Sequence, residues 1–295
     1  MKKQLIFLII FNITIISTLI SIPKNNELNY SEQVTHYEYF NVYYDSHKRN
    51  TLDLTLPKNN TNGLILFIHG GSWLSGDKEV YKNNLLEWTI NKRFAACAIN
   101  YHYAYGMTNY EDILNDISNA LSRVKQLAEH KNIILTKVLL TGHSAGGHLS
   151  LLYAYSRIDN SPIKPACVVN LSGPTDLNDI NYFSKNPLKI GYIFSSLTNR
   201  IITTSNYTKK YNILKNVSPI NYITNNTVPT LTGHGTKDTV VPYSNAIKLH
   251  QILNQNNVIN DLIEFPNSNH GLESDQNKTE ILNKLMYEYA IKYLS

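Results

Sequence analysis

The stretch of residues 137–147 constrains the fold of this chain more than any other feature of its sequence. Four residues, Val-Leu-Leu-Thr, run directly into Gly-His-Ser-Ala-Gly, and a segment with helical spacing follows at 147–156. This order predicts a strand, a sharp turn and a helix, with Ser144 at the apex of the turn. Gly142 and Gly146 permit so tight a turn, because a Cβ at either place would clash with nearby backbone. The Ser144 hydroxyl is therefore expected to stand clear of a sheet edge, at the N-terminus of a helix.

Apolar runs alternate with helix-like segments along most of the remaining chain. Strands are predicted over residues 34–44, 51–56, 64–68, 94–101, 137–140, 166–171, 229–233 and 258–265. Helices are predicted over residues 79–91, 110–130, 147–156, 244–254 and 279–293. The first two strands have the alternation of an antiparallel pair. Strands that alternate with helices predict an α/β fold: a mostly parallel, twisted eight-stranded sheet with helices on both faces. Residues 34–295 are expected to form one domain.

Residues 177–222 interrupt this alternation. The segment is rich in Asn, Ser, Thr, Tyr and Lys and contains no obvious strand. It is too long for an ordinary connection within a compact domain. We therefore expect a functional insertion or lid here, and expect it to influence specificity.

Composition and charge limit the classes of function. The formal net charge is +5, and the lysines and arginines are scattered without a block of five or six. Such scattering indicates solvated surface and argues against nucleic acid as a partner. The two cysteines, Cys97 and Cys167, both lie in apolar strand-like runs, which favours buried thiols over a disulfide or metal site. Cys-x-x-Cys and His-Glu-x-x-His patterns do not occur, so neither a metal nor another cofactor is expected.

The first 22 residues have the composition of a targeting segment. Met-Lys-Lys supplies a positive start, and residues 5–22 are almost wholly apolar before Pro23. This pattern fits a cleaved secretory signal peptide. The apolar run is also just long enough to serve as an uncleaved membrane anchor. Either alternative predicts a secreted or extracytoplasmic protein, attached to the membrane in the second case.

A serine hydroxyl is a poor nucleophile at neutral pH unless a base takes its proton. The best candidate for the base is His270, in the turn-rich segment Pro-Asn-Ser-Asn-His-Gly between a predicted strand and the last helix. The best candidate for the acid that orients the base is Asp238, in a loop directly after another predicted strand. Asp176 and Glu264 are competing acids. The chain order Ser, Asp, His is the one that accompanies a serine elbow of this kind.

A glycine pair follows the third predicted strand, in the sequence His-Gly-Gly-Ser-Trp. Paired glycines allow backbone N–H groups to turn toward a developing oxyanion. The expected donors are the N–H groups of Gly71, Ser72 and Ala145. We expect His69 to anchor this loop, and Trp73 to pack beneath it or to line the substrate pocket.

Together these motifs resemble those of the α/β-hydrolase superfamily. The resemblance rests on His-Gly-Gly-Ser-Trp at 69–73, Gly-His-Ser-Ala-Gly at 142–146, Asp238 and His270, and it covers nearly the whole chain after residue 34. The first motif is similar to that of bacterial acetyl and feruloyl esterase-like hydrolases and of kynurenine formamidases. Hormone-sensitive-lipase-like carboxylesterases usually carry a third glycine where this chain has Ser72. The resemblance implies an α/β-hydrolase fold and acyl transfer to water through an acyl-Ser144.

The motifs leave the substrate open. A carboxylic ester is the first choice, with a small-molecule or glycan ester as substrate and a carbohydrate acetyl esterase as one candidate. A formamidase or other amidase, and a lipase-like enzyme or peptidase, are the alternatives that share this machinery. A binding protein that keeps the hydrolase fold without catalysis is the rival from another class. Oligomeric state does not follow from the sequence.

Overall fold

The computed structural model describes residues 35–58, 61 and 63–295, and these residues form an eight-stranded sheet. Its strands are β1 (His36–Tyr43), β2 (Thr51–Pro57), β3 (Gly63–Ile68), β4 (Ala95–Ile99), β5 (Lys137–His143), β6 (Lys164–Leu171), β7 (Thr230–Gly235) and β8 (Asn260–Phe265). The spatial order is β1-β2-β4-β3-β5-β6-β7-β8. Strand β2 is antiparallel to β1 and β4, and every other neighbouring pair is parallel. The predicted mostly parallel, eight-stranded sheet is confirmed.

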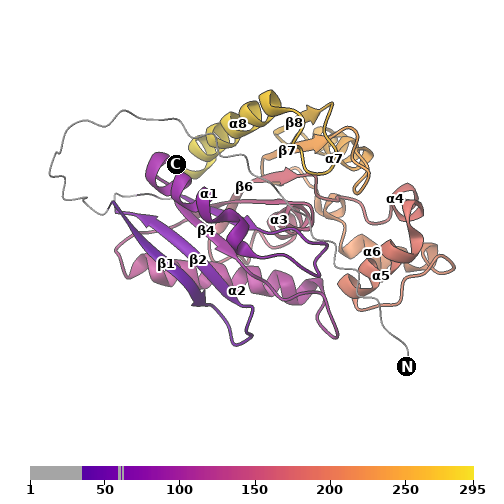
Figure 1. The fold of residues 1–295 in the computed structure, drawn as a ribbon, viewed down its shortest axis with the longest axis horizontal. Helices are drawn as coiled ribbons and strands as arrows, with labels where there is room; N and C mark the ends of the chain where they lie inside the picture. Colours follow the sequence, from indigo (N-terminus) through magenta and orange to yellow (C-terminus); the bar gives the residue numbers. More distant parts are fainter. Residues whose placement is uncertain (1–34, 59–60, 62) are drawn as a thin grey trace. The chain divides into compact units, whose positions relative to one another are not determined.

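Helices cover both faces of this sheet, also as predicted (Figure 1). The longer helices are α2 (Tyr110–Glu129), α3 (Ala145–Ser156), α7 (Ser244–Gln255) and α8 (Gln276–Leu294). Buried side chains of α2, α3 and α7 pack on one face, and those of α8 and the short α1 (Lys82–Leu86) pack on the other. The alternation within β3 matches this division, because Leu64, Leu66 and Ile68 belong to the first core and Ile65 and Phe67 to the second. A strand buried on both faces accounts for the unbroken apolar run.

Residues 79–91 form a broken helix and not the single helix that the sequence predicts. A 3₁₀ turn η1 (Lys78–Tyr81) leads into α1, which leads into a π turn η2 (Glu87–Asn91). In the last turn the Thr89 hydroxyl lies 2.6 Å from the Thr55 hydroxyl and 3.1 Å from the Phe94 carbonyl oxygen. These contacts hold the turn against the sheet. The Thr55 hydroxyl also lies 3.2 Å from the Leu85 carbonyl oxygen, so a helix acceptor is shared with the sheet.

The insertion at 177–222 contains helices that the sequence analysis did not predict. They are α4 (Ile180–Lys185), α5 (Pro187–Thr198) and α6 (Tyr211–Asn216), with the 3₁₀ turns η3 (Thr208–Lys210) and η4 (Pro219–Tyr222). Helix α5 begins with a cap in which Asn186 Oδ1 accepts a hydrogen bond from Lys189 N–H, and it ends at Asn199 in the left-handed conformation. Phe194 and Leu197 of α5 are fully buried, so the insertion extends the first core.

Within the described residues, none of the helices combines the length and the apolar character needed to cross a bilayer. The predicted signal peptide or membrane anchor at residues 1–22 lies outside the described residues.

Candidate active site

Ser144 occupies the turn between β5 and α3, in a backbone conformation that few residues adopt. Its φ of 57° and ψ of −121° put a non-glycine residue at positive φ. Strain of this kind is retained where the surrounding structure enforces it, often at functional sites. The surroundings are tight: a Cβ on Gly146 would lie 1.9 Å from the Ile68 carbonyl oxygen, and one on Gly142 would lie 2.3 Å from it. The glycines thus let β3 and the turn approach each other, and the side chain of Ser144 is left partly exposed.

The structure brings Ser144, His270 and Asp238 into one hydrogen-bonded series. Ser144 Oγ lies 2.9 Å from His270 Nε2, and His270 Nδ1 lies 2.7 Å from Asp238 Oδ2. The three residues come from the carboxyl ends of β5, β8 and β7, which parallel pairing gathers at one edge of the sheet. The His270 side chain is 19% exposed, whereas that of Asp238 is fully buried. The imidazole therefore stands between a buried carboxylate and a hydroxyl that solvent can reach.

The local environment keeps the Asp238 carboxyl ionised. Burial alone would raise its pKa, but hydrogen bonds from His234 and His270 and the charge of His270 hold the pKa well below its usual range. Oδ1 also accepts hydrogen bonds from the N–H groups of Val240 and Val241, both at 2.8 Å. The carboxylate is consequently fixed in orientation, with Oδ1 toward the backbone and Oδ2 toward the imidazoles.

Two further side chains hold the loop that carries His270. Asn269 Oδ1 accepts hydrogen bonds from His270 N–H at 2.8 Å and from Thr239 N–H at 2.9 Å, so it joins the loop of the base to that of the acid. His143 Nε2 donates to the His270 carbonyl oxygen at 2.7 Å. Burial lowers the pKa of His143 to about 4, aided by the charge of His270, so the ring stays neutral near pH 7. The sequence analysis did not assign a role to either residue.

The glycine-rich loop lies against the serine turn. A Cβ on Gly70 would lie 3.4 Å from Ser144 Cβ. Gly71 has φ +114°, and its carbonyl oxygen accepts hydrogen bonds from Leu74 and Ser75 N–H, both at 3.0 Å. Because these turn bonds use the carbonyl group of Gly71, they do not engage the N–H groups of Gly71 and Ser72. Both residues are partly exposed.

Ala145 is the first residue of α3, where a backbone N–H has no acceptor within the helix. The three predicted oxyanion donors, Gly71, Ser72 and Ala145, thus come from a loop and a helix start that lie next to each other. All three N–H groups lie outside the regular hydrogen bonding of the elements that carry them.

His69 is buried and anchors this loop. Its Nδ1 donates to the Gly70 carbonyl oxygen at 2.7 Å, and Arg49 donates to its Nε2 at 3.3 Å. The ring stacks on Tyr101 with centroids 4.3 Å apart, and burial lowers its pKa to about 4. A neutral ring with both nitrogens engaged is a structural anchor, and it is not available as a second base.

Trp73 packs beneath the loop. Its side chain is 3% exposed, and Nε1 donates to His148 Nδ1 at 3.2 Å. His148 Nε2 donates in turn to the Val217 carbonyl oxygen at 2.7 Å. The indole therefore links the glycine-rich loop through α3 to the insertion. Its predicted role in lining a substrate pocket stays a prediction.

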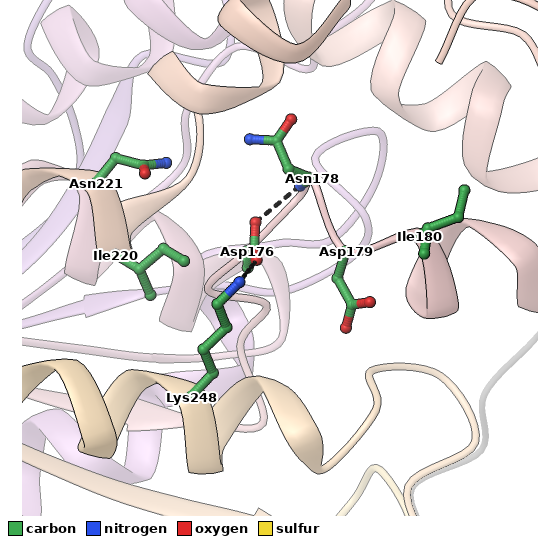
Figure 2. Close-up of a pocket in the computed structure, with 7 residues that line it drawn as sticks. All are labelled: Asp176, Asn178, Asp179, Ile180, Ile220, Asn221 and Lys248. Atoms are coloured by element: carbon green, nitrogen blue, oxygen red, sulfur yellow. Dashed lines mark hydrogen bonds and ion pairs between the residues drawn. The ribbon is translucent and has the colours of Figure 1, made fainter. Parts of the chain in front are cut away.

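The two competing acids lie in other interactions. Asp176 forms an ion pair with Lys248 of α7, and its Oδ1 accepts a hydrogen bond from Asn178 N–H at 2.9 Å (Figure 2). The residues around this pair line a hollow of about 300 Å³: Asp176, Asn178, Asp179, Ile180, Ile220, Asn221 and Lys248. Glu264 accepts a hydrogen bond from the Tyr243 hydroxyl at 2.6 Å. Asp238 is thus the acid that contacts His270.

A lysine of the insertion contacts the acid loop. Lys185, the last residue of α4, donates through Nζ to the Asp238 carbonyl oxygen at 3.3 Å. The contact puts one end of the insertion beside the site. Among the residues that the structure describes, no group of three or more His, Cys, Asp or Glu side chains is arranged to hold a metal ion.

Comparison with known proteins identifies the family. The family model BD-FAE matches residues 52–253, which include the glycine-rich loop, the serine turn and Asp238. The chain belongs to the BD-FAE family. It is 23% identical over 225 residues to esterase LipC of Mycobacterium tuberculosis, and 26% identical over 204 residues to the probable carboxylic ester hydrolase LipM of the same organism. These matches cover 71% and 68% of this chain but 53% and 46% of the relatives. The chain thus spans about half the length of these two curated relatives.

Solved structures of esterases share the α/β-hydrolase fold of this chain. A truncated carbohydrate esterase from gut microbiota superposes with a TM-score of 0.71 and 21% identity, over 88% of this chain and 98% of the other. Esterase B from Lactobacillus rhamnosis superposes with a TM-score of 0.70 and 16% identity, over 87% of this chain and 85% of the other. An acetyl ester-xyloside bifunctional hydrolase from Caldicellulosiruptor lactoaceticus superposes with a TM-score of 0.62 and 21% identity, over 81% of this chain and 87% of the other. At these identities the comparison establishes the fold.

Proposed function

We propose that this protein is a carboxylic ester hydrolase that works through an acyl-Ser144 intermediate. The observation that carries the proposal is the series of hydrogen bonds from Ser144 Oγ through His270 to the ionised Asp238. The esterase names of the related M. tuberculosis proteins support an ester as substrate, and they do not favour a formamide. Nucleophile, base and orienting acid are all in contact, which argues against an inactive binding protein.

The proposed reaction has two halves. His270 Nε2 takes the Ser144 proton as Oγ bonds to the ester carbonyl carbon, and the carbonyl oxygen becomes an oxyanion. The N–H groups of Gly71, Ser72 and Ala145 stabilise this oxyanion, each by roughly 3–4 kcal/mol of barrier. The oxyanion then collapses, the ester C–O bond breaks, and the alcohol leaves with the proton from His270.

The second half returns the enzyme to its starting state. Water gives a proton to His270 Nε2 and adds to the acyl carbon, and the acid leaves as Ser144 Oγ recovers that proton. Asp238 remains a carboxylate throughout, because its pKa lies well below its usual range. It stabilises the imidazolium and keeps the Nδ1–H tautomer, in which Nε2 faces the serine.

The substrate class that we propose is a small-molecule or glycan ester, with acetyl groups on a carbohydrate as the leading candidate. The support is that two proteins with the same fold are named a carbohydrate esterase and an acetyl ester-xyloside hydrolase. Initial rates on p-nitrophenyl acetate, an acetylated xylan and N-formylkynurenine test this choice. Faster turnover of the formamide than of either ester would refute it.

A fluorophosphonate probe tests for an active serine independently of the substrate. We expect the probe to label the wild-type protein and to leave Ser144→Ala unlabelled. Folded wild-type protein that stays unlabelled would favour the inactive binding protein.

We also propose that the protein acts outside the cytoplasm, on the strength of the positive start and apolar run in residues 1–22. Cell fractionation with N-terminal sequencing tests this. A mature N-terminus after the apolar run indicates a secreted protein, and an intact one in the membrane fraction indicates an anchor. Intact protein in the cytosol would refute the proposal.

A further inference from the structure

Asp238 faces a second histidine besides His270. His234 lies on β7, four residues before Asp238, and its side chain is fully buried. Its Nε2 lies 3.3 Å from Asp238 Oδ2 and 3.1 Å from the Val241 carbonyl oxygen. Oδ2 is also the atom that accepts the hydrogen bond from His270 Nδ1, at 2.7 Å. One carboxylate oxygen therefore lies between two imidazoles.

The partners of His234 assign its tautomer. A carbonyl oxygen only accepts hydrogen bonds, so Nε2 carries the proton that points toward Val241 and Asp238. Nδ1 is buried and has no hydrogen-bond partner within the described part of the chain. A proton on Nδ1 would be buried without an acceptor, which is costly. His234 is accordingly neutral, with Nε2–H as its donor.

The backbone already fixes the orientation of the carboxylate. Oδ1 accepts from the N–H groups of Val240 and Val241, both at 2.8 Å, and neither bond involves His234. What His234 adds is a donor on Oδ2. A hydrogen bond donated to Oδ2 lowers the negative charge density on that oxygen. Oδ2 then attracts the proton on His270 less strongly.

We propose that His234 is a positioning residue that sets how strongly Asp238 attracts the proton on His270. The inference rests on the proposed function, because it assigns His270 as the base. When the His234 donor is removed, Oδ2 attracts the imidazolium form of His270 more strongly. Protonation of His270 then becomes easier, and the base is lost at a higher pH.

Other titratable and charged groups face this pair from four elements, and a test must leave them unchanged. They are His143 at the end of β5, Tyr182 and Lys185 on α4, Tyr243 next to α7, and Glu264 of β8, which pairs with His234 in the sheet and accepts a hydrogen bond from Tyr243. Lys185 contacts the Asp238 carbonyl oxygen and not its carboxylate. Tyr243 lies with its ring centroid 5.8 Å from that of His234. None of these groups supplies a hydrogen bond to Oδ2 among the contacts of the described residues.

Three variants separate the donor from the packing of the ring. His234→Leu fills a similar volume without a donor. His234→Gln carries an amide nitrogen at about the distance of Nε2 along the side chain. Thr232→Val is the matched control, because Thr232 lies on the same face of β7 and is fully buried, and its hydroxyl has no hydrogen-bond partner among the described residues.

Two measurements are made on the full chain. The first is the pH profile of kcat/KM for p-nitrophenyl acetate, whose acid limb follows the protonation of His270. The second is the titration midpoint of the His270 ring by NMR, which does not depend on turnover. Thermal unfolding of each variant is followed in parallel.

We expect His234→Leu to move both the acid limb and the NMR midpoint upward by roughly 0.5–1 pH unit. His234→Gln and Thr232→Val should keep the wild-type values. An unmoved or lowered midpoint in His234→Leu, with only a loss of thermal stability, would overturn the proposal and leave His234 as a packing residue.

If His234→Leu does not fold, His234→Asn takes its place, because its amide falls one atom short of the carboxylate. The same upward shift is expected, and the same null result would overturn the proposal. If no variant or wild type turns over the ester, the proposed function fails, yet the NMR midpoint still decides the role of His234.

Discussion

Replacement of Asp238 by asparagine should reverse the proton arrangement of the site while its shape is retained. In the wild type Oδ1 accepts from two backbone N–H groups, Val240 and Val241, and Oδ2 accepts from His270 Nδ1–H. An amide cannot place its NH₂ group toward Val240 and Val241 without opposing two buried donors, at about 1–3 kcal/mol for each group left unpaired. The amide oxygen therefore stays on the backbone side, and the NH₂ group faces His270.

The consequence is a change of tautomer. The NH₂ group donates to His270 Nδ1, so the ring proton moves to Nε2, where it faces Ser144 Oγ in place of a lone pair. The base can then no longer accept the serine proton. We expect kcat/KM at neutral pH to fall by about 10⁴-fold, which corresponds to about 5.4 kcal/mol of transition-state stabilisation. Ser144→Ala and His270→Ala should lose more.

The assay is hydrolysis of p-nitrophenyl acetate by the variant and by Asp176→Asn, the matched control at the competing acid. Circular dichroism and thermal unfolding check that both variants fold. Asp176 is paired with Lys248 and does not contact His270, so its variant should stay within about threefold of wild-type kcat/KM. A fully active Asp238→Asn together with an inactive Asp176→Asn would refute the assignment of the acid.

Three further predictions concern the turn, the base and the response to acid. Gly146→Ala should lower the free energy of unfolding by about 3 kcal/mol or more, because its Cβ would lie 1.9 Å from the Ile68 carbonyl oxygen. Urea unfolding measures this change, and a loss below about 1 kcal/mol would contradict the prediction. His143→Leu removes the donor to the His270 carbonyl oxygen, so kcat/KM should fall about 10- to 100-fold at nearly unchanged KM; unchanged kcat would contradict it. Burial lowers the pKa of His69 and His143 to about 4 from an unfolded value near 6.5, so the unfolded chain binds more protons between these values. Stability should therefore fall as pH drops from about 6.5 to 4, by about 1.4 kcal/mol per pH unit for each histidine; a urea midpoint constant over this range would contradict it.

The local sequence was enough to predict the sheet and the elements next to the site. The apolar runs of β3 and β5 have no polar alternation, because both strands are buried on both faces. The spacing of Gly142, Ser144 and Gly146 predicted the turn, because only residues without a side chain fit beside the Ile68 carbonyl oxygen. The strands follow from residues that are adjacent in the chain, and the turn follows from one close approach between its glycines and β3.

The insertion was harder to predict. Helices α4 and α6 have six residues each, too few for a helical period to stand out in the sequence. The capping signals of α5 were nonetheless present, with Asn186 before Pro187 at the start and Asn199 at the end. The broken segment at 79–91 was predicted as one helix. The contacts of Thr89 with Thr55 and Phe94 hold its last turn in place, and the helical spacing of the segment does not reveal them.

The residues that support the base and the acid were not found from the sequence. His143 contacts the carbonyl oxygen of His270, 127 positions away, and Asn269 contacts Thr239, 30 positions away. His234 contacts the carbonyl oxygen of Val241, seven positions away. Sequence spacing carries little information on such contacts. The interval His-Gly-x-x-Asp at 234–238 was the one available signal, because it puts an imidazole close to the carboxylate at the end of the same strand.

The central claim is that Ser144 carries the acyl group during ester hydrolysis. Rapid-quench peptide mass spectrometry tests it most directly, with the protein mixed with an excess of p-nitrophenyl acetate and stopped with acid within a turnover. The account predicts an acetylated peptide that contains Ser144 in the wild type, and none in Ser144→Ala or His270→Ala. Steady hydrolysis by a fully active wild type with the acetyl group on another residue, or an undiminished rate in Ser144→Ala, would contradict it.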